Sequence, residues 1–410
     1  MKKYGLALLG LIVIAATAFF IVAPTYFEKQ TNVIDGKPLP EVTAEAQKLH
    51  DSLFIVDLHS DTLLWKRKIT DSVERGHVDW KRMQQGNVGL QVFSSVTKTP
   101  RGQNYDSNSA DSDNITLLTI TQLQPVRTWF SILERQLYHA QKLRDASIIS
   151  GGGLFPIGSP KNIDTLLASR RDVKSTSAQP SKIGVMFSAE GLQSLEGKRE
   201  SLQKLYDSGM RMAGLVHFFD NKLAGSMHGE EKGGLTDFGR QIIVDMEEMG
   251  MIVDIAHSSH KTVAEILKMA RRPVVSSHGG VQAVCSVNRN LTDEEIKGVA
   301  ATGGVIGLGY WDGAMCDTDP KSVAKAAKHI RDLAGIDHVA LGSDFDGAVT
   351  TRFDTSGIVH ITQALMDAGF TEKEIRAVMG LNALRVIKLG LLPMGELPQQ
   401  AVEPQGESSQ

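Results

Sequence analysis

The chain of 410 residues has few cysteines, no internal repeat and no excess of charge of either sign. It carries 44 basic against 47 acidic residues and no basic block outside the extreme N-terminus, so nothing indicates binding to nucleic acid. The two cysteines, Cys285 and Cys316, either pair in an oxidising compartment or are two buried thiols. Neither cysteine is assigned a functional role.

Long apolar runs are also rare, with one exception at the N-terminus. Lys2 and Lys3 precede an almost uninterrupted apolar run from about Tyr4 to Ala23. This run is close to the ~20 residues that span a bilayer and longer than the ~7–15-residue core of a cleaved signal peptide. We therefore expect an uncleaved signal anchor, with the two lysines in the cytoplasm and the remainder of the chain across the membrane.

A cleaved N-terminus is the alternative. Ala16, Thr17 and Ala18 resemble the small residues of a signal-peptidase site, and cleavage there would release a soluble, exported protein. No cysteine lies near this site, so a lipoprotein anchor is not indicated. In both cases the folded domain is expected outside the cytoplasm, in a periplasmic or extracellular location.

Eight short apolar runs rich in β-branched residues follow, and helical patterns separate them. Nearly continuous apolar strands are typical of a parallel sheet that is covered on both faces. Eight strands alternating with helices predict an α/β fold, a (β/α)₈ TIM barrel. The predicted strands cover residues 53–58, 88–93, 183–188, 211–216, 251–256, 273–277, 303–309 and 338–343.

The helical patterns carry capping signals. Thr236 precedes a run with apolar residues at helical spacing that Gly250 closes. Thr292 and Thr371 are each followed three residues later by glutamate, which predicts two capping boxes.

Four segments are predicted along the chain. They are a signal anchor or signal peptide (1–27), a polar spacer (28–47), the barrel (48–392) and a disordered tail (393–410). The stretch 97–182 is long for one connection. It is expected to add helices, and whether these form a lid over the site is left open.

Polar side chains are expected at the C-terminal ends of most strands, which is where barrels of this type carry their active sites. For any one of these polar residues alone, a structural role in the core, in a turn or as a helix cap is a simpler interpretation than a functional role. Independent turn residues, however, have no reason to collect on one rim. The residues are His59 and Asp61 after the first strand, Glu190 after the third, His217 after the fourth, His257 after the fifth, His278 after the sixth and Asp344 after the eighth.

These residue types suit divalent metal ions. Side chains two apart on a strand point the same way, so His59 and Asp61 are expected to converge. Three histidines, an aspartate and a glutamate are enough for two metals when one carboxylate bridges them. Imidazole-rich ligation favours zinc over magnesium or calcium. The remaining histidines are left out of the predicted site, including His50, His77, His139, His228, His260, His329, His338 and His360.

The sequence resembles the membrane dipeptidase (renal dipeptidase) family of zinc metallopeptidases, which have amidohydrolase-like barrels. The resemblance extends from about Leu53 to Leu391, whereas the insert 97–182 matches poorly. Phe218 and Phe219 depart from the family pattern, because many relatives carry a polar residue there. The matching stretches are VDLHSDTL, MFSAEGLQSL, GLTDFGRQIIVDMEEMGMIVDIAHSS, VVSSHGG, NRNLTDEEI, ALGSDFDG and GLNALRV.

The resemblance implies a role for each of these residues. Glu190 would bridge two Zn²⁺ ions per chain, with His59 and Asp61 completing one site and His257 and His278 the other. His217 and Arg289 would hold the substrate, and Asp344 would handle protons and the substrate amine.

The predicted activity is therefore hydrolysis of dipeptides that have a free C-terminal carboxylate, through a metal-bridging hydroxide. His217 would stabilise the oxyanion, and Arg289 would bind the carboxylate. The alternatives are a barrel hydrolase of another small amide, such as a β-lactam or an N-acyl amino acid, and a membrane-tethered protein that binds metal or peptide without turnover. The oligomeric state is not readable, and a homodimer is left open.

Overall fold

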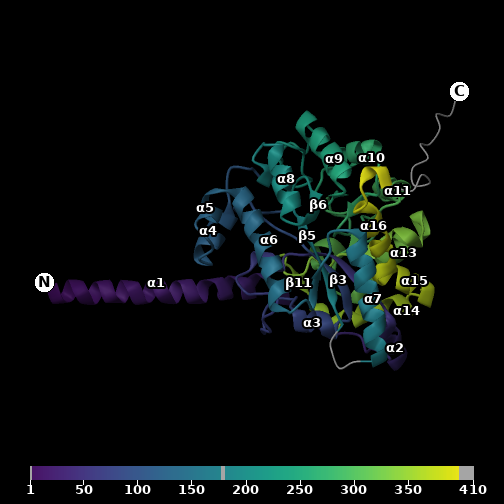
Figure 1. Cartoon of the computed structure of the whole chain (residues 1–410), viewed down its shortest axis with the longest axis horizontal. Coiled ribbons are helices and arrows are strands. Elements are labelled where there is room, and N and C mark those ends of the chain that lie inside the picture. Colours follow the sequence, from purple (N-terminus) through teal and green to yellow (C-terminus); the bar gives the residue numbers. More distant parts are fainter. Residues whose placement is uncertain (1, 177–180, 397–410) are drawn as a thin grey trace.

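The computed structural model describes residues 2–176 and 181–396, and it confirms the predicted (β/α)₈ barrel. Eight parallel strands close on themselves, because β3 pairs with β5 and β2 pairs with β10. Figure 1 shows helices surrounding these strands. The barrel strands are β2 (Ile55–Ser60), β3 (Val88–Phe93), β5 (Ile183–Ala189), β6 (Met210–Gly214), β7 (Ile252–Asp254), β8 (Val275–Ser276), β9 (Val305–Leu308) and β10 (Val339–Leu341).

The strands are apolar because both faces of the sheet are buried. Every residue of β2, β3 and β5 is buried, as expected for a parallel sheet between a packed interior and a layer of helices. The helices around the barrel are α2 (Ala44–Ser52), α3 (Trp80–Gln85), α8 (Glu200–Asp207), α9 (Asp237–Met249), α10 (His260–Met269), α11 (Asp293–Ala301), α12 (Asp312–Met315), α13 (Pro320–Ala334), α14 (Val359–Asp367), α15 (Glu372–Arg376) and α16 (Asn382–Gly390).

The predicted capping signals are confirmed. The Thr236 side chain accepts a hydrogen bond from the Gly239 backbone at the start of α9, and Gly250 ends that helix with a φ of 70°. Thr292 and Thr371 each form a capping box, at the start of α11 and α15 respectively. These caps fix where the helices begin, and hence where the preceding loops end.

The insert adds helices, as predicted. It contains α4 (Asn114–Thr121), α5 (Arg127–Phe130), α6 (Ile132–Ile149) and α7 (Pro160–Thr176). It also contains a short strand, β4 (Leu154–Pro156), which pairs with β5. Figure 1 places α4 and α5 at one end of the molecule, on the side from which the N-terminal helix extends.

The N-terminal helix α1 (Lys2–Thr31) extends away from the barrel (Figure 1). Its last turns pack on the domain, because the buried Glu28 carboxylate accepts hydrogen bonds from Arg67 Nε at 2.5 Å and Arg75 Nε at 2.7 Å. The helix therefore continues into the stretch 28–47 that the sequence predicts to be a polar spacer. Within the described ranges, no helix combines the length and the apolar character needed to cross a membrane.

A short strand follows α1, and a short 3₁₀ turn lies at the C-terminal end of the domain. After α1, β1 (Val33–Ile34) pairs in parallel with β11 (Thr350–Thr351), which follows the last barrel strand. At the C-terminal end, Met394–Glu396 form a short 3₁₀ turn. The rest of the predicted disordered tail, 397–410, lies outside the described residues.

Candidate active site

The structure brings the polar side chains of the strand ends together in one buried cluster. Ligand atoms from three groups of side chains lie within 4.8 Å of one another inside each group. Glu190 and His59 each belong to two of the groups, so the groups overlap. The groups are His59 with Glu190 and His278, Glu190 with His217 and His257, and His59 with Asp61 and Asp344.

Glu190 lies at the centre of this cluster. One of its carboxylate oxygens, Oε1, lies 2.8 Å from His257 Nε2, 3.2 Å from His278 Nε2 and 3.6 Å from His59 Nε2. The other, Oε2, lies 3.3 Å from His217 Nε2. The carboxylate is thus shared by four imidazole rings that come from four different strand ends.

His59 connects this centre to the other two carboxylates. Its Nε2 atom lies 3.5 Å from Asp61 Oδ2 and 3.8 Å from Asp344 Oδ1. His59 is on β2 and Asp61 directly follows that strand, so the expected convergence of these two side chains is observed. Both residues are buried.

The backbone conformations of His257 and Asp344 are unusual and orient their side chains. His257 and Asp344 adopt left-handed conformations with φ values of 64° and 60°, which are uncommon for residues other than glycine. Such conformations persist where the surrounding structure enforces them and are frequent at functional sites. Here they occur three residues after the ends of β7 and β10.

Two buried aspartates that sequence reasoning missed hold the strand ends in place. Asp57 accepts hydrogen bonds from the Ser343 backbone at 2.8 Å and the Ser343 hydroxyl at 2.6 Å. Asp254 accepts one from the Ser277 backbone at 2.9 Å. Each aspartate therefore ties its own strand to a neighbouring loop of the site. Their signal in the sequence is an acidic residue inside an apolar strand, two residues before His59 in one case and three before His257 in the other.

The electrostatics of the cluster favour a bound cation. Burial raises the pKa of Glu190 well above its usual value, and the neighbouring Asp61 adds to the effect. Burial also raises the pKa of Asp344, to about 8. Although burial opposes protonation of His59, the charges of Asp61, Glu190 and Asp344 raise its pKa to about 10. Without a cation, burial thus disfavours the charged forms of Glu190 and Asp344, and a divalent cation would stabilise them.

The donor set also fits metal ions. Burial lowers the pKa values of His217, His257 and His278 well below the usual value, so their rings are neutral and have a free lone pair. His59 Nε2 and Asp61 Oδ1 are buried without a hydrogen-bond partner among the described residues. Buried polar atoms without partners are rare, and metal coordination would satisfy both.

Ser277 orients two of the rings. Its hydroxyl lies 2.9 Å from His278 Nδ1 and 3.4 Å from His59 Nδ1, so the Nε2 atom of each ring is left to face Glu190. Partners of this kind fix the ring orientation of metal-binding histidines. The residues present therefore fit the metal ions that the sequence predicts.

A cavity of about 840 Å³ opens beside the cluster. Arg289 lines one half of it, and its guanidinium donates a hydrogen bond from Nη2 to the His278 carbonyl oxygen at 2.9 Å. The same guanidinium lies 5.6 Å from the centre of the Trp311 ring. Trp311 Nε1 in turn donates to the Tyr105 hydroxyl at 3.0 Å, and the Tyr105 ring stacks on Phe218. Arg289 thus lies in an aromatic half of the cavity.

Several residues of this half were not predicted. Tyr105 belongs to a loop of the insert, and neither Tyr105 nor Trp311 is among the residues that the sequence predicts for the site. Phe218, one of the two residues that depart from the family pattern, lines the cavity. His228 is buried and stacks on Phe218, whereas His260 is half exposed at the start of α10 and pairs with Glu295 at 2.7 Å. Neither of these two histidines belongs to the three groups of ligand atoms.

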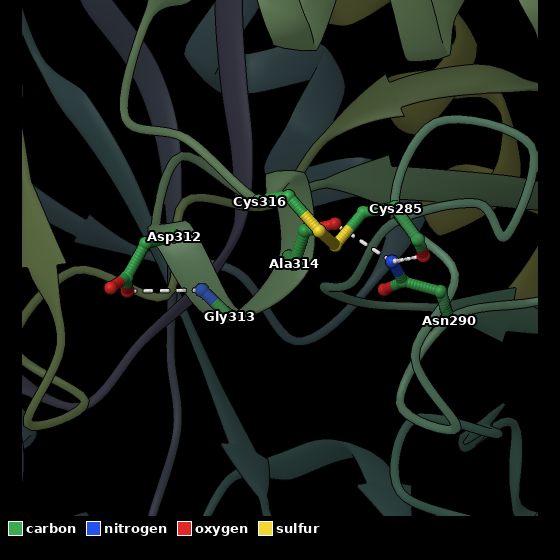
Figure 2. The surroundings of a disulfide bond; sticks show 6 residues. All are labelled: Cys285, Asn290, Asp312, Gly313, Ala314 and Cys316. Atoms are coloured by element: carbon green, nitrogen blue, oxygen red, sulfur yellow. Dashed lines mark hydrogen bonds between the residues drawn. A yellow bond between two sulfur atoms is a disulfide. The ribbon is translucent and has the colours of Figure 1, made fainter.

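A disulfide supports the loop that carries Arg289. Cys285 and Cys316 are bonded, which decides between the two alternatives for these cysteines. Figure 2 shows Asn290 beside the disulfide, where its Nδ2 donates to the carbonyl oxygens of Cys285 at 2.8 Å and Ala314 at 2.7 Å. The loop after β8 is therefore fixed to α12, the short helix that follows Trp311.

The other half of the cavity is mainly apolar. Leu64, Trp65, Ile115 and Leu118 belong to one cluster of apolar side chains, and all of them line the cavity. Residues of α1 also reach it, namely Phe19, Phe27 and Thr31. Sequence reasoning missed this contribution, because it treated the N-terminal segment only as a targeting signal.

Curated relatives of this chain are dipeptidases. The chain is 29% identical over 357 residues to the dipeptidase aclJ of Aspergillus oryzae, covering 81% of this chain and 77% of the relative. It is 26% identical over 342 residues to the dipeptidase tcpJ of Claviceps purpurea, covering 78% and 73% of the two chains.

Solved structures of metallopeptidases share the fold of this chain. The dipeptidase AC, a metallopeptidase of family M19, matches with a TM-score of 0.67 at 20% identity over 82% of this chain and 98% of that one. A metallopeptidase from Rhodobacter sphaeroides, liganded with a phosphinate mimic of the dipeptide L-Ala-D-Ala, matches with a TM-score of 0.64 at 19% identity over 82% and 99%. These two likenesses support the fold. The sequence model of the membrane dipeptidase family (peptidase family M19) matches residues 159–390, more than half of the chain, and the chain therefore belongs to this family of metallo dipeptidases.

Proposed function

We propose that the protein is a zinc-dependent dipeptidase that hydrolyses the amide bond of dipeptides with a free C-terminal carboxylate. The observation that carries this proposal is the arrangement around Glu190, where four imidazoles and two further carboxylates converge beside the buried Arg289. These residues would supply metal ligands, an acid/base group and a carboxylate anchor within one cavity.

Two metal ions would share Glu190. His59 and Asp61 would complete one site, and His257 and His278 the other. The preponderance of imidazole nitrogen favours zinc. When bound, the ions would supply Lewis-acid activation of water and of the scissile carbonyl group.

The remaining polar residues supply the other parts of the reaction. Asp344 is buried and its carboxylate lies 3.8 Å from His59 Nε2, where it would accept a proton from the attacking water and pass it to the leaving amine. His217 is placed to donate a hydrogen bond to the developing oxyanion from the side of Glu190 Oε2.

Arg289 would define the substrate as a dipeptide. Its guanidinium is buried, and its Nε has no hydrogen-bond partner among the described residues, so donors remain for a substrate carboxylate. The phosphinate mimic of a dipeptide in the solved Rhodobacter sphaeroides relative supports a dipeptide as the substrate.

A hydrolysis assay on a dipeptide library, with metal analysis of the same sample, tests this proposal. We expect hydrolysis of free dipeptides, loss of activity after chelation and recovery with added zinc. Faster hydrolysis of N-acyl amino acids or β-lactams would favour the other small-amide hydrolases. Retention of metal without hydrolysis of any of these compounds would indicate a binding protein.

We also propose that the domain functions outside the cytoplasm, in the periplasm or the extracellular space. The support is the pair Lys2 and Lys3 before an apolar run, and the disulfide between Cys285 and Cys316, a bond that persists in oxidising compartments. Fractionation with N-terminal sequencing tests this. Intact chain in the membrane fraction would indicate an anchor, a soluble form that begins near Phe19 would indicate cleavage, and intact chain in the cytosol would contradict the proposal.

A further inference from the structure

The active-site cavity has a wall that does not come from the barrel. Phe19, Phe27 and Thr31 line the cavity, and all three lie on helix α1. Together with Ala23, which is buried, they are spaced by four residues, so they form one stripe along the helix. Phe27 keeps 45% of its surface exposed, as expected for a side chain at the rim of an open cavity.

The position of this wall is fixed by several contacts near the end of α1. Glu28 forms ion pairs with Arg67 and Arg75. Asn32 Oδ1 accepts a hydrogen bond from the Ala348 backbone at 2.9 Å, and the Val33 backbone donates to the Val349 carbonyl oxygen at 3.1 Å. These contacts hold α1 against the loop that follows Asp344.

The same loop also connects the catalytic cluster to the wall. Arg67 pairs with Asp346 as well as with Glu28, and all three charged groups are buried. Gly347, Ala348 and Val349 then line the cavity between Asp344 and the end of α1. A substrate group that extends from Asp344 along these residues would therefore meet Phe27.

The two halves of the cavity differ in their chemistry. Arg289 lies in the half with Trp311 and Tyr105, where the proposed function places the substrate carboxylate. Phe27 lines the same cavity as the apolar cluster of Leu64, Trp65, Val96 and Ile115. With the carboxylate held at Arg289, the first residue of a dipeptide would point away from that half.

We propose that Phe27 is a specificity-determining residue, which selects dipeptides with a large apolar side chain on their amino-terminal residue. This inference rests on the proposed dipeptidase function, and on the orientation that Arg289 would impose. The cavity of about 840 Å³ leaves room for a side chain of this kind. Burying a large apolar side chain is favourable in proportion to the area removed from water, so Phe27 would contribute only where such a side chain is present.

The test uses the full-length chain and three dipeptides, Phe-Ala, Ala-Ala and Ala-Phe. Phe27→Ala should lower kcat/KM for Phe-Ala about 5- to 20-fold and change that for Ala-Ala and Ala-Phe less than about twofold. Phe27→Leu should retain most of the selectivity, because it keeps an apolar group at the rim. Tyr26→Ala is the matched control, since Tyr26 is the neighbouring exposed aromatic residue and is 57% exposed.

The outcomes separate this inference from the proposed function. If the wild type hydrolyses none of the three dipeptides, the dipeptidase proposal fails and this inference fails with it. If it hydrolyses them but Phe27→Ala leaves the ratio of Phe-Ala to Ala-Ala unchanged, only the role of Phe27 is refuted. An equal loss with Ala-Phe, or an equal effect of Tyr26→Ala, would likewise contradict selection of the first residue by Phe27.

Discussion

Removal of the Arg289 side chain tests whether the enzyme recognises the free carboxylate of a dipeptide. Arg289 is 2% exposed, and within the described parts of the chain its guanidinium donates one hydrogen bond, to the His278 carbonyl oxygen. Donors on the guanidinium therefore remain for a ligand. A hydrogen bond between charged groups is worth about 1.5–3 kcal/mol, so Arg289→Ala should lower kcat/KM roughly 10- to 150-fold, and further if two bonds are lost.

The assay compares a free dipeptide with its C-terminal amide. The wild type should hydrolyse the amide poorly, because a buried guanidinium then faces a neutral group. Arg289→Ala should lose little further activity on the amide, since the partner of the missing carboxylate is already absent. The two substrates should thus become nearly equivalent for the variant.

Two controls exclude an indirect effect. Arg289→Gln keeps a donor for the His278 carbonyl oxygen but removes the charge, and it should discriminate between acid and amide as weakly as Arg289→Ala does. Metal content should stay at the wild-type level in both variants. If either variant hydrolyses the free dipeptide with near wild-type efficiency, or still rejects the amide as strongly as the wild type, Arg289 does not anchor the carboxylate.

Three further predictions concern the metal ligands, the acid/base group and the disulfide. Elemental analysis should find about two zinc ions per chain, and Glu190→Gln should weaken binding of both, whereas two tightly held ions in that variant would exclude a shared carboxylate. Asp344→Asn should lower kcat by about 10²- to 10⁴-fold while the metal content is retained; a change in KM alone would contradict an acid/base role. Loss of the disulfide in the Cys285→Ser, Cys316→Ser double variant, which opens a loop with a sequence separation of 31, should lower the free energy of unfolding by about 3–4 kcal/mol in chemical denaturation, and an unchanged denaturation midpoint would refute this.

The barrel was predictable because its pattern is regular. Each strand is a short apolar run, most of them are followed by a polar residue, and the C-terminal ends of parallel strands in a barrel lie on one rim. This rule alone places His59, Glu190 and His278 near one another, although they are far apart in the sequence. Local caps such as Thr292 were readable for a similar reason, since the capping box depends on residues three apart.

The other half of the site depends on contacts that no local pattern encodes. Tyr105 and Trp311 meet through one hydrogen bond between segments that are 206 residues apart. Helix α1 reaches the cavity because two arginines of a distant loop bind Glu28. The apolar run that precedes Glu28 has the composition of a targeting signal, and this composition does not reveal that the helix packs on the barrel. The sequence likewise leaves the pairing of the two cysteines open, because it depends on where the loops that carry them lie.

The parallel pairing of β1 with β11 has a consequence for how the protein is made. Val33 pairs with Thr350, and Asp57 of the first barrel strand pairs with Leu341 of the last. Both strand pairings therefore join residues from opposite ends of the domain sequence. Contacts of such large sequence separation form late and slowly during folding. A nascent chain that ends before about residue 340 thus lacks Asp344 and the support for α1, and the edge of its first barrel strand that pairs with β10 is exposed to aggregation. The active site is completed only when nearly the whole domain has been synthesised.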